Sequence, residues 1–311
     1  MSTVLVTGLD GGLARLTALL LAEQGAQVIG VARQAPKAPI DGVALHVLEL
    51  RGPQLREVLG AGAVDAVVHL AQPGEEQPAG RTGGGHVLAT VELLSACAAA
   101  GVRRVVLRSS TLVYGARLGQ PLLRAEDAPL RLRGRGTARH DDVEVERFAA
   151  GFARKNPSTA VTVLRCASLV GGDVSSPLAR YLQRMTPPML LGYDPLVQVL
   201  HASDAALMFA LAALVEGVSG AFNLAAEGPL ALSQAVRLAG RQPLPLPAAT
   251  FQARGAFAGL AGVLPRDLPF PLEFFRFACL ADTSKAVAQL DFTPRHTAQE
   301  ALQAVAAVAG G

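Results

Sequence analysis

Short apolar runs separated by helical stretches dominate the first half of the chain. Six such runs predict strands at Thr3–Val6, Gln27–Val31, Ala44–Leu48, Ala66–Leu70, Val105–Arg108 and Val161–Arg165. The runs are apolar throughout instead of alternating with polar positions, as expected where helices cover both faces of a parallel sheet. Strands that alternate with helices predict an α/β fold, namely a Rossmann-type doubly wound parallel sheet.

After about residue 166 the pattern changes, because prolines become frequent and the elements shorten. Helices remain clear at Ser203–Glu216 and Thr297–Val308. We therefore expect residues 1–166 to form the core of the Rossmann domain. Residues 167–311 are expected to form a smaller, mixed α/β C-terminal lobe over the carboxyl ends of the strands, with some elements returning to the Rossmann sheet.

Composition narrows the class of protein. Half of the 311 residues are hydrophobic and 17% are charged, which suits a folded globular chain. The formal net charge of +3 predicts no strong attraction to nucleic acid or to anionic lipid. Three widely spaced cysteines indicate reduced thiols and no metal site. The N-terminus lacks a signal-peptide pattern and the longest apolar run, Ala205–Val215, is too short to span a bilayer, so a cytoplasmic protein is expected.

A glycine-rich segment links the first predicted strand to the first predicted helix, with the sequence Thr7-Gly8-Leu9-Asp10-Gly11-Gly12-Leu13-Ala14. Gly8 permits a tight turn, Gly11 lets the backbone approach a pyrophosphate, and the small Ala14 lets helix and strand pack closely. The pyrophosphate then lies against the helix N-terminus. This context favours a dinucleotide site over a glycine turn retained only for packing.

The end of the second strand usually selects the cofactor, since an acidic side chain there binds the ribose 2′-hydroxyl of NAD. This chain has Val31-Ala32-Arg33 at that place, without a carboxylate. Arg33 can pair with a 2′-phosphate, which modestly favours NADP over NAD. The alternative is that Arg33 is a solvated residue at the strand end. The predicted cofactor-binding residues are Thr7, Gly8, Asp10, Gly11, Gly12, Leu13, Arg33, Glu49, Leu70 and Ala71.

Further motifs follow along almost the whole chain. They are Val67-Val68-His69-Leu70-Ala71, Ser109-Ser110-Thr111-Leu112-Val113-Tyr114-Gly115, Val199–Asp204, Ala221–Ala225 and Asp282–Lys285 with Leu290 and Pro294. Together with the glycine-rich loop they resemble the extended short-chain dehydrogenase/reductase (SDR) family, also called the NAD-dependent epimerase/dehydratase family. The resemblance implies a nicotinamide cofactor and, in most members, a nucleotide-sugar substrate bound between two lobes. By the same match, Ser110 is the hydroxyl that hydrogen-bonds the substrate oxygen.

The chain departs from this family at the pair of residues that carries the chemistry. The family places a Tyr, the general acid/base, on the helix after the serine segment, and four residues later a Lys that lowers the pKa of the Tyr. Here the Tyr position falls on Thr137 or Ala138 and the Lys position on Asp141 or Asp142. No Tyr-x-x-x-Lys occurs anywhere in the sequence. An Asn position of the family, in the helix before the fifth strand, is His86.

Two groups near the expected site, Tyr114 and His140, are candidates for a replacement acid/base, since either side chain can carry a proton. His140 oriented by Asp141 or Asp142 would resemble an activated base. The alternative is a solvated histidine at the start of a helix whose first turn favours the two aspartates.

Residues 249–280 contain six of the eleven phenylalanines. This concentration indicates the core of the C-terminal lobe with a hydrophobic lid, or else a site for a lipophilic small molecule or a protein partner. The exposure of these side chains in a structure distinguishes the two interpretations.

Three functions therefore stay open. The first is an NAD(P)-binding family member without ordinary SDR catalysis, a pseudoenzyme with a binding, sensing or scaffold role. The second is an active NAD(P)-dependent epimerase, dehydratase or reductase that acts on a nucleotide-sugar or lipid-linked substrate through a relocated acid/base. The third is a structural protein that no longer binds the dinucleotide. Family analogy adds a homodimer to the expected partners.

Overall fold

A seven-stranded parallel sheet is the centre of the computed structural model, which describes residues 2–36, 38–71, 85–131, 138–172, 174, 176–252, 268 and 270–309. The strand order is β12-β7-β5-β4-β1-β2-β3. The strands are β1 (Thr3–Thr7), β2 (Gln27–Ala32), β3 (Val43–Val47), β4 (Ala66–His69), β5 (Arg104–Ser110), β7 (Ala160–Cys166) and β12 (Gly220–Leu224). The predicted Rossmann-type doubly wound sheet is confirmed.

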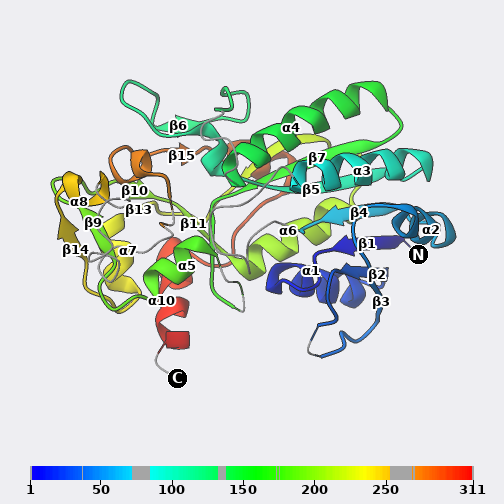
Figure 1. Cartoon of the computed structure of the whole chain (residues 1–311), viewed down its shortest axis with the longest axis horizontal. Coiled ribbons are helices and arrows are strands. Elements are labelled where there is room, and N and C mark those ends of the chain that lie inside the picture. Colours follow the sequence, from blue (N-terminus) through cyan, green and yellow to red (C-terminus); the bar gives the residue numbers. More distant parts are fainter. Residues whose placement is uncertain are drawn as a thin grey trace.

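Helices cover both faces of this sheet (Figure 1). Helices α2, α3 and α4 pack on one face, and α1 packs against α6 on the other. Strand β1 is therefore buried at every residue, with Leu5 in one core and Val4 and Val6 in the other. The bounds of these helices are α1 (Gly12–Glu23), α2 (Pro53–Ala61), α3 (Gly85–Ala99), α4 (Ala138–Lys155) and α6 (Ala202–Leu214).

Strand β3 differs from the expectation that helices cover every strand. It lies at the edge of the sheet beside β2, and all of its side chains after Val43 are exposed. The prediction of burial on both faces is wrong for this strand, because the described helices leave its side chains after Val43 uncovered.

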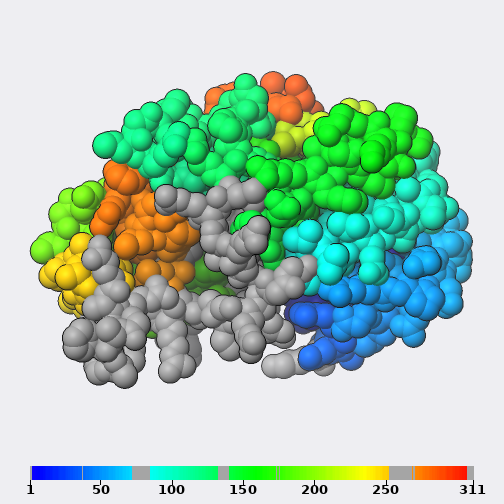
Figure 2. Space-filling model, turned by 45° about the horizontal axis from the view of Figure 1, so that its top comes forward, coloured from blue at the N-terminus to red at the C-terminus, as the bar shows by residue number. Residues whose placement is uncertain are grey.

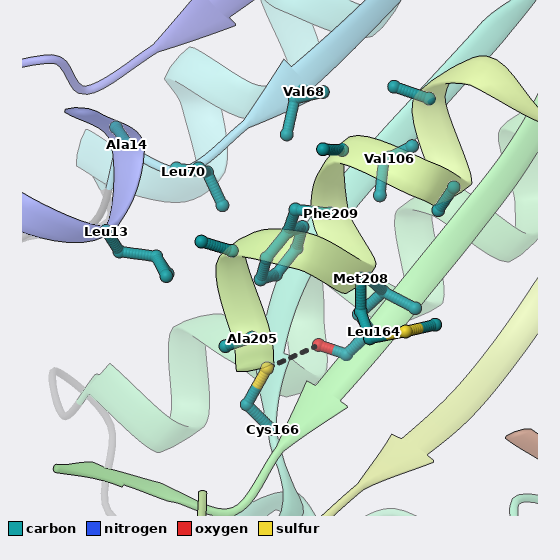
Figure 3. Packing of buried hydrophobic residues seen from close by; sticks show 14 of the residues in the cluster. Leu13, Ala14, Val68, Leu70, Val106, Leu164, Cys166, Ala205, Met208 and Phe209 are labelled. Atoms are coloured by element: carbon teal, nitrogen blue, oxygen red, sulfur yellow. Dashed lines mark hydrogen bonds between the residues drawn. The ribbon is translucent and has the colours of Figure 1, made fainter. Parts of the chain in front are cut away.

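The second half of the chain completes the core of the Rossmann sheet. Strand β12 pairs in parallel with β7, and helix α6 packs on α1. The buried cluster that contains Phe209 of α6 also contains Leu13 of α1 and Leu164 of β7 (Figure 3). The sheet therefore depends on segments that come from both halves of the sequence.

The C-terminal lobe is built from short elements, drawn on the opposite side from β1–β3 in Figure 1. Paired two-stranded units are β8 (Ser168–Val170) with β11 (Val199–His201), β9 (Pro188–Leu190) with β14 (Leu244–Leu246), β10 (Leu196–Val197) with β13 (Leu230–Ala231), and β6 (Leu123–Arg124) with β15 (Leu280–Ala281). The remaining helices are α5 (Pro177–Leu182), α7 (Leu232–Leu238), α8 (Ala248–Gln252), α9 (Ser284–Leu290) and α10 (Ala298–Ala309), with 3₁₀ turns η1 (Thr111–Tyr114) and η4 (Leu272–Phe275). Of these, α9 packs against β12 of the seven-stranded sheet.

The phenylalanines of segment 249–280 contribute to the core of this lobe. Phe251, Phe270, Phe274 and Phe275 are buried. The ring of Phe275 contacts the rings of Phe251 and Phe270. Phe277 is half-buried. Phe257 lies outside the described residues. Burial of four side chains supports the interpretation of this segment as lobe core.

None of the helices in the described ranges combines the length and the apolar character that crossing a bilayer requires. The three cysteines are free thiols, of which Cys97 and Cys166 are buried and Cys279 is partly exposed. The described residues bring no three potential metal ligands together.

Candidate functional site

The glycine-rich loop joins β1 to α1 at the carboxyl edge of the sheet. Gly8 has a φ of +82°, and a Cβ atom at this position would lie 2.7 Å from the Cα atom of Ala71. Both the backbone conformation and the space therefore require glycine. The Gly8 amide donates to the carbonyl of Val31 at 2.9 Å, so the loop is fixed against the ends of β2 and β4.

The N-terminus of α1 is the anion-binding feature of this loop. Gly11 precedes the helix in an extended conformation, with φ −98°, and has no side chain that could cap the helix. The first turn also carries no acidic residue. The first amides of an α-helix have no intrahelical partner and lie at the positive end of its dipole. A pyrophosphate fits this donor set, since it accepts from such amides and balances their charge.

The pair formed by Arg33 and Asp10 stands where a ribose 2′-group is expected. The Arg33 Nη2 atom lies 3.6 Å from the Asp10 Oδ2 atom, and the Arg33 side chain is 46% exposed. Such an exposed ion pair is weak, so both groups remain able to contact a ligand. The loop thus brings the carboxylate of Asp10 close to Arg33 at the end of β2. Glu49, two residues beyond β3, is exposed.

A buried chain of hydrogen bonds connects β1, β4 and α3 beneath this loop. The Thr7 Oγ1 atom lies 2.8 Å from His69 Nδ1, and His69 Nε2 lies 3.0 Å from Thr90 Oγ1. Thr90 donates its own hydroxyl proton to the His86 carbonyl, so it accepts from His69 Nε2–H while Thr7 donates to Nδ1. Burial lowers the pKa of His69 to about 3, and the ring stays neutral. The Thr7 oxygen also accepts from the amides of Leu70 and Ala71.

His86, which stands at the Asn position of the family, stacks on His69 with 5.7 Å between ring centroids. Burial, and then the nearby Arg108 guanidinium, lower the pKa of His86 to about 4. Arg108 comes from β5, so a permanent positive charge lies near the start of α3.

Ser110 is the last residue of β5 and stands at the same edge of the sheet. Its Oγ atom accepts from the Leu112 amide at 3.2 Å, which caps the 3₁₀ turn η1. The side chain is half-buried, so the hydroxyl is held at the boundary between β5 and the following turn.

Tyr114 of η1 lies in the interior, with 1% of its surface exposed. Its hydroxyl donates to Asn223 Oδ1 at 2.7 Å and accepts from Arg165 Nη1 at 2.6 Å. Burial raises the pKa of Tyr114, although the neighbouring Arg165 opposes the shift. Both hydrogen-bonding functions of the hydroxyl are therefore used within the protein.

Arg165 makes the principal ion pair of this region, with Glu146 of α4. Their closest atoms, Nη2 and Oε2, are 2.7 Å apart, and neither side chain is more than 6% exposed. Arg165 Nε donates to both oxygens of the carboxylate, and Ser109 donates its hydroxyl to Oε1. This network fixes the orientation of α4 against β5 and β7.

Two buried aspartates occupy the start of α4. Asp141 and Asp142 are both less than 9% exposed, and Asp142 precedes Glu146 by four residues, so the two share one helix face. Burial, together with the negative charges of Glu146 and Asp141, raises the pKa of Asp142 to about 7, while Arg108 acts in the opposite direction. His140 is half-buried beside them. Thr137 lies outside the described residues.

The structure places the loop residues, Leu70, Ala71 and Ser110 along one edge of the sheet. Tyr114 instead lies in the interior, where its hydroxyl is hydrogen-bonded to Asn223 and Arg165. The sequence interpretation did not assign His69 or Arg108 to the site, and it considered Asp142 only as a match to the family's lysine or as a partner of His140. His69 belongs to the motif Val67–Ala71, and the signal that could have identified Arg108 was a charged residue directly after the apolar run Val105–Leu107 of β5.

Replacement of Asp142 by Asn is expected to change the pH dependence of stability. The pKa of Asp142 is about 7 in the folded protein and 3.8 without the fold, so its stabilising contribution is fully present below about pH 4 and is lost as the pH rises through 7. Between about pH 5 and pH 8, the free energy of unfolding of Asp142→Asn should rise relative to wild type by roughly 2–3 kcal/mol. Urea unfolding at several pH values measures this difference.

The matched control is Asp127→Asn, which changes an exposed aspartate in the same way. A difference between Asp142→Asn and wild type that stays constant from pH 5 to pH 8 would contradict the raised pKa.

Comparison with known proteins identifies structures with the same fold and the family of the chain. An uncharacterized protein of Mycobacterium tuberculosis is 33% identical over 262 residues, which cover 81% of this chain and 68% of that protein.

The structure of MoeE5 in complex with UDP-glucose and NAD superposes with a TM-score of 0.74 at 23% identity, covering 98% of both chains. A UDP-glucose-4-epimerase from Stenotrophomonas maltophila with bound NAD gives a TM-score of 0.76 at 21% identity, covering 100% of this chain and 98% of that chain. At these identities the two structures show a shared fold. The model of the NAD dependent epimerase/dehydratase family matches residues 4–225, and the chain belongs to that family.

Proposed function

We propose that this protein binds an NAD(P) dinucleotide and serves as a binding, sensing or scaffold protein without the ordinary catalysis of its family. The observation that carries the proposal is the pair of buried carboxyls, Asp141 and Asp142, at the place where the family uses a lysine. The glycine-rich loop supports dinucleotide binding. The sequence has no Tyr-x-x-x-Lys pair for proton transfer.

The phosphate-binding part of the site supports the first half of the proposal. Gly8 allows the loop to approach β4, and the uncapped N-terminus of α1 offers amide donors to a pyrophosphate. The related fold of MoeE5 was solved with NAD, which supports the same type of ligand here. A bound nicotinamide supplies hydride transfer, and this chain's contribution is to hold the dinucleotide through its backbone amides.

The charge at the start of α4 supports the second part of the proposal, the lack of the family's ordinary catalysis. A lysine at this position holds the cofactor ribose and stabilises the ionised form of the family tyrosine. The carboxyls of Asp141 and Asp142 provide no positive charge, and they lie beside a third buried carboxyl, that of Glu146. Arg108 supplies a positive charge nearby, but a guanidinium stays protonated and does not relay protons.

Dinucleotide binding should be measurable by calorimetry and should depend on Gly11. A Gly11→Val variant is expected to fold, because a φ of −98° is open to any residue, and to lose binding, because its side chain occupies the space of the pyrophosphate. Gly60→Ala is the control, since a Cβ atom at that helical position meets no atom within 4 Å. If wild type binds neither NADPH nor NADH, the protein is a structural member of the family that has lost its cofactor.

We further propose a preference for NADP, on the evidence of Arg33. Arg33→Ala should weaken NADPH binding by roughly 1–3 kcal/mol, the scale of a charge-assisted hydrogen bond, and leave NADH binding nearly unchanged. Asp10→Asn should strengthen NADPH binding, because it removes the carboxylate that competes with the 2′-phosphate for Arg33. Titrations of both variants with both cofactors test this, and equal wild-type affinities for NADPH and NADH would contradict it.

A second candidate function follows from Asp142. A carboxyl with a pKa of about 7 matches the requirement for a general acid/base at neutral pH. With Ser110 at the same edge of the sheet, Asp142 could serve an active epimerase, dehydratase or reductase that acts on a nucleotide-sugar or lipid-linked substrate. His140, two residues earlier on the same helix, is a second candidate for the acid/base.

We expect no turnover of UDP-glucose, measured both as nicotinamide absorbance and as chromatographic detection of an epimerised or oxidised sugar. Proton transfer by a positioned acid/base contributes about 10²–10⁴-fold to such reactions, and the family's proton carrier is absent. Clear wild-type turnover that collapses in Asp142→Asn, in His140→Ala or in Tyr114→Phe would instead establish a relocated acid/base and identify the residue.

A further inference from the structure

Arg108 leaves β5 on the same side of the strand as Ser110, because successive residues of a strand alternate between the two faces of the sheet. The residue between them, Ser109, is buried and donates its hydroxyl to Glu146 of α4. Arg108 and Ser110 are half-buried, whereas the preceding residues Val105–Leu107 are buried. Arg108 therefore stands where β5 emerges from the core at the carboxyl edge of the sheet.

The charge of Arg108 acts on groups of three other elements. Burial has the largest influence on the pKa values of Asp142 on α4, His86 on α3 and Cys166 on β7, and the charge of Arg108 also lowers each of them. Helix α3 follows β4 and α4 precedes β7 in the parallel sheet, so both helices begin at the carboxyl edge. Helices α3, cyan in Figure 2, and α4, green, lie side by side. The guanidinium thus lies over the end of β5, near the starts of α3 and α4.

This place coincides with the path of a dinucleotide. The strand order reverses between β1 and β4, since β2 and β3 continue on one side and β5, β7 and β12 on the other. A dinucleotide binds at such a switch point, with its pyrophosphate at the first helix and its adenosine ribose at the end of β2. Its nicotinamide half then extends over β4 and β5. Two strand spacings, about 10 Å in total, separate β5 from β1, and the long side chain of Arg108 shortens that span.

We propose that the Arg108 guanidinium binds the nicotinamide half of the dinucleotide, and that the Asp142 carboxylate competes with the dinucleotide for this guanidinium. The inference deepens the proposed function, on which it rests for the presence of a dinucleotide. A guanidinium offers several N–H donors to ribose hydroxyls or phosphate oxygens and keeps its charge at neutral pH. Arg108 therefore takes over the binding role of the family's lysine without its role in proton transfer.

Several charged or titratable side chains surround the start of α4. The described ones are Arg108, His86 and Arg165 from the neighbouring elements, and His140, Asp141, Asp142 and Glu146 on the helix itself. Arg165 is ion-paired with Glu146. Burial lowers the pKa of His86 to about 4, so its ring is neutral. Of the two arginines, Arg108 is therefore the one that an ionised Asp142 attracts.

The competition makes dinucleotide binding depend on the proton of Asp142. An ionised Asp142 pairs with Arg108 and repels the pyrophosphate, whereas a protonated Asp142 leaves the guanidinium to the ligand. The pKa of this carboxyl is about 7, mainly through burial. The affinity for an anionic dinucleotide should therefore be highest below pH 7 and fall as the pH rises through 7.

Calorimetric titration of the full chain with NADH at about pH 6 tests the role of Arg108. NADH is chosen because it lacks the 2′-phosphate, which itself titrates near this pH. Arg108→Met should weaken NADH binding roughly tenfold or more, the effect of one charge-assisted hydrogen bond, and Arg108→Lys, which keeps the charge, should recover most of the loss. ADP lacks the nicotinamide half and should bind wild type and Arg108→Met equally. Arg103→Met is the control, since Arg103 is exposed, pairs with Asp65 and lies at the opposite end of β5.

The same titrations at about pH 6 and about pH 8 test the competition by Asp142. The wild-type Kd for NADH should rise roughly tenfold over this range, as uptake of one proton on binding requires. Asp142→Asn cannot ionise at this position and should bind NADH with the high affinity at both pH values. Asp127→Asn, which changes an exposed aspartate, should keep the wild-type pH dependence. Thermal unfolding verifies that each variant is folded.

Equal NADH binding by wild type and folded Arg108→Met would overturn the inference, and so would an equal loss of NADH and ADP binding, which indicates a structural role. A pH dependence that is absent from wild type, or that persists in Asp142→Asn, would overturn the competition. These outcomes leave the proposed function intact, because wild type still binds the dinucleotide. Wild type that binds neither NADH nor NADPH would overturn the proposed function and this inference together.

Discussion

The buried guanidinium of Arg165 is the interaction on which the functional edge of this protein depends. A guanidinium removed from water needs acceptors around it, and unpaired it would be strongly destabilising. Arg165 finds them in Glu146 of α4, in the Tyr114 hydroxyl of η1 and in the Glu126 carbonyl after β6. One side chain at the end of β7 therefore fixes three segments of the chain against the sheet. Asn223 of β12 extends the network, because it accepts from Tyr114 and donates to the backbones of Arg124 and Asp282.

This constraint has consequences for the chemistry of the site. Tyr114 is committed as both donor and acceptor, so its hydroxyl contributes to the architecture of the edge. Because Glu146 faces Arg165, Asp142 one turn earlier faces the same way, into a region that already holds a negative charge. The result is a carboxyl with a pKa of about 7 at one of the two positions, Asp141 or Asp142, that match the family's lysine by sequence. The fold tolerates this reversal of charge since the ion pair that holds α4 is a different one.

The two ends of the carboxyl edge of the sheet differ in the groups that they present. At β1 and β2, glycines and an uncapped helix N-terminus expose backbone amides, which suits an anionic ligand. Beyond β5, the described lining of the pocket beside η1 combines three phenylalanines and two leucines with the polar side chains of Thr111, Ser168 and Gln198.

The sequence by itself determined the sheet, the glycine loop and the absence of a Tyr-x-x-x-Lys pair, because each is a local pattern of a few neighbouring residues. The exposure of β3 and the return of β12 to the sheet were decided by tertiary structure, since both depend on which segments become neighbours. The same holds for the site. Tyr114 meets Asn223 across 109 positions and Arg165 across 51, so the sequence offered Tyr114 as a proton carrier while the fold buried it. The pKa of Asp142 likewise depends on its burial and on Arg108 of β5, neither of which the sequence around Asp142 contains.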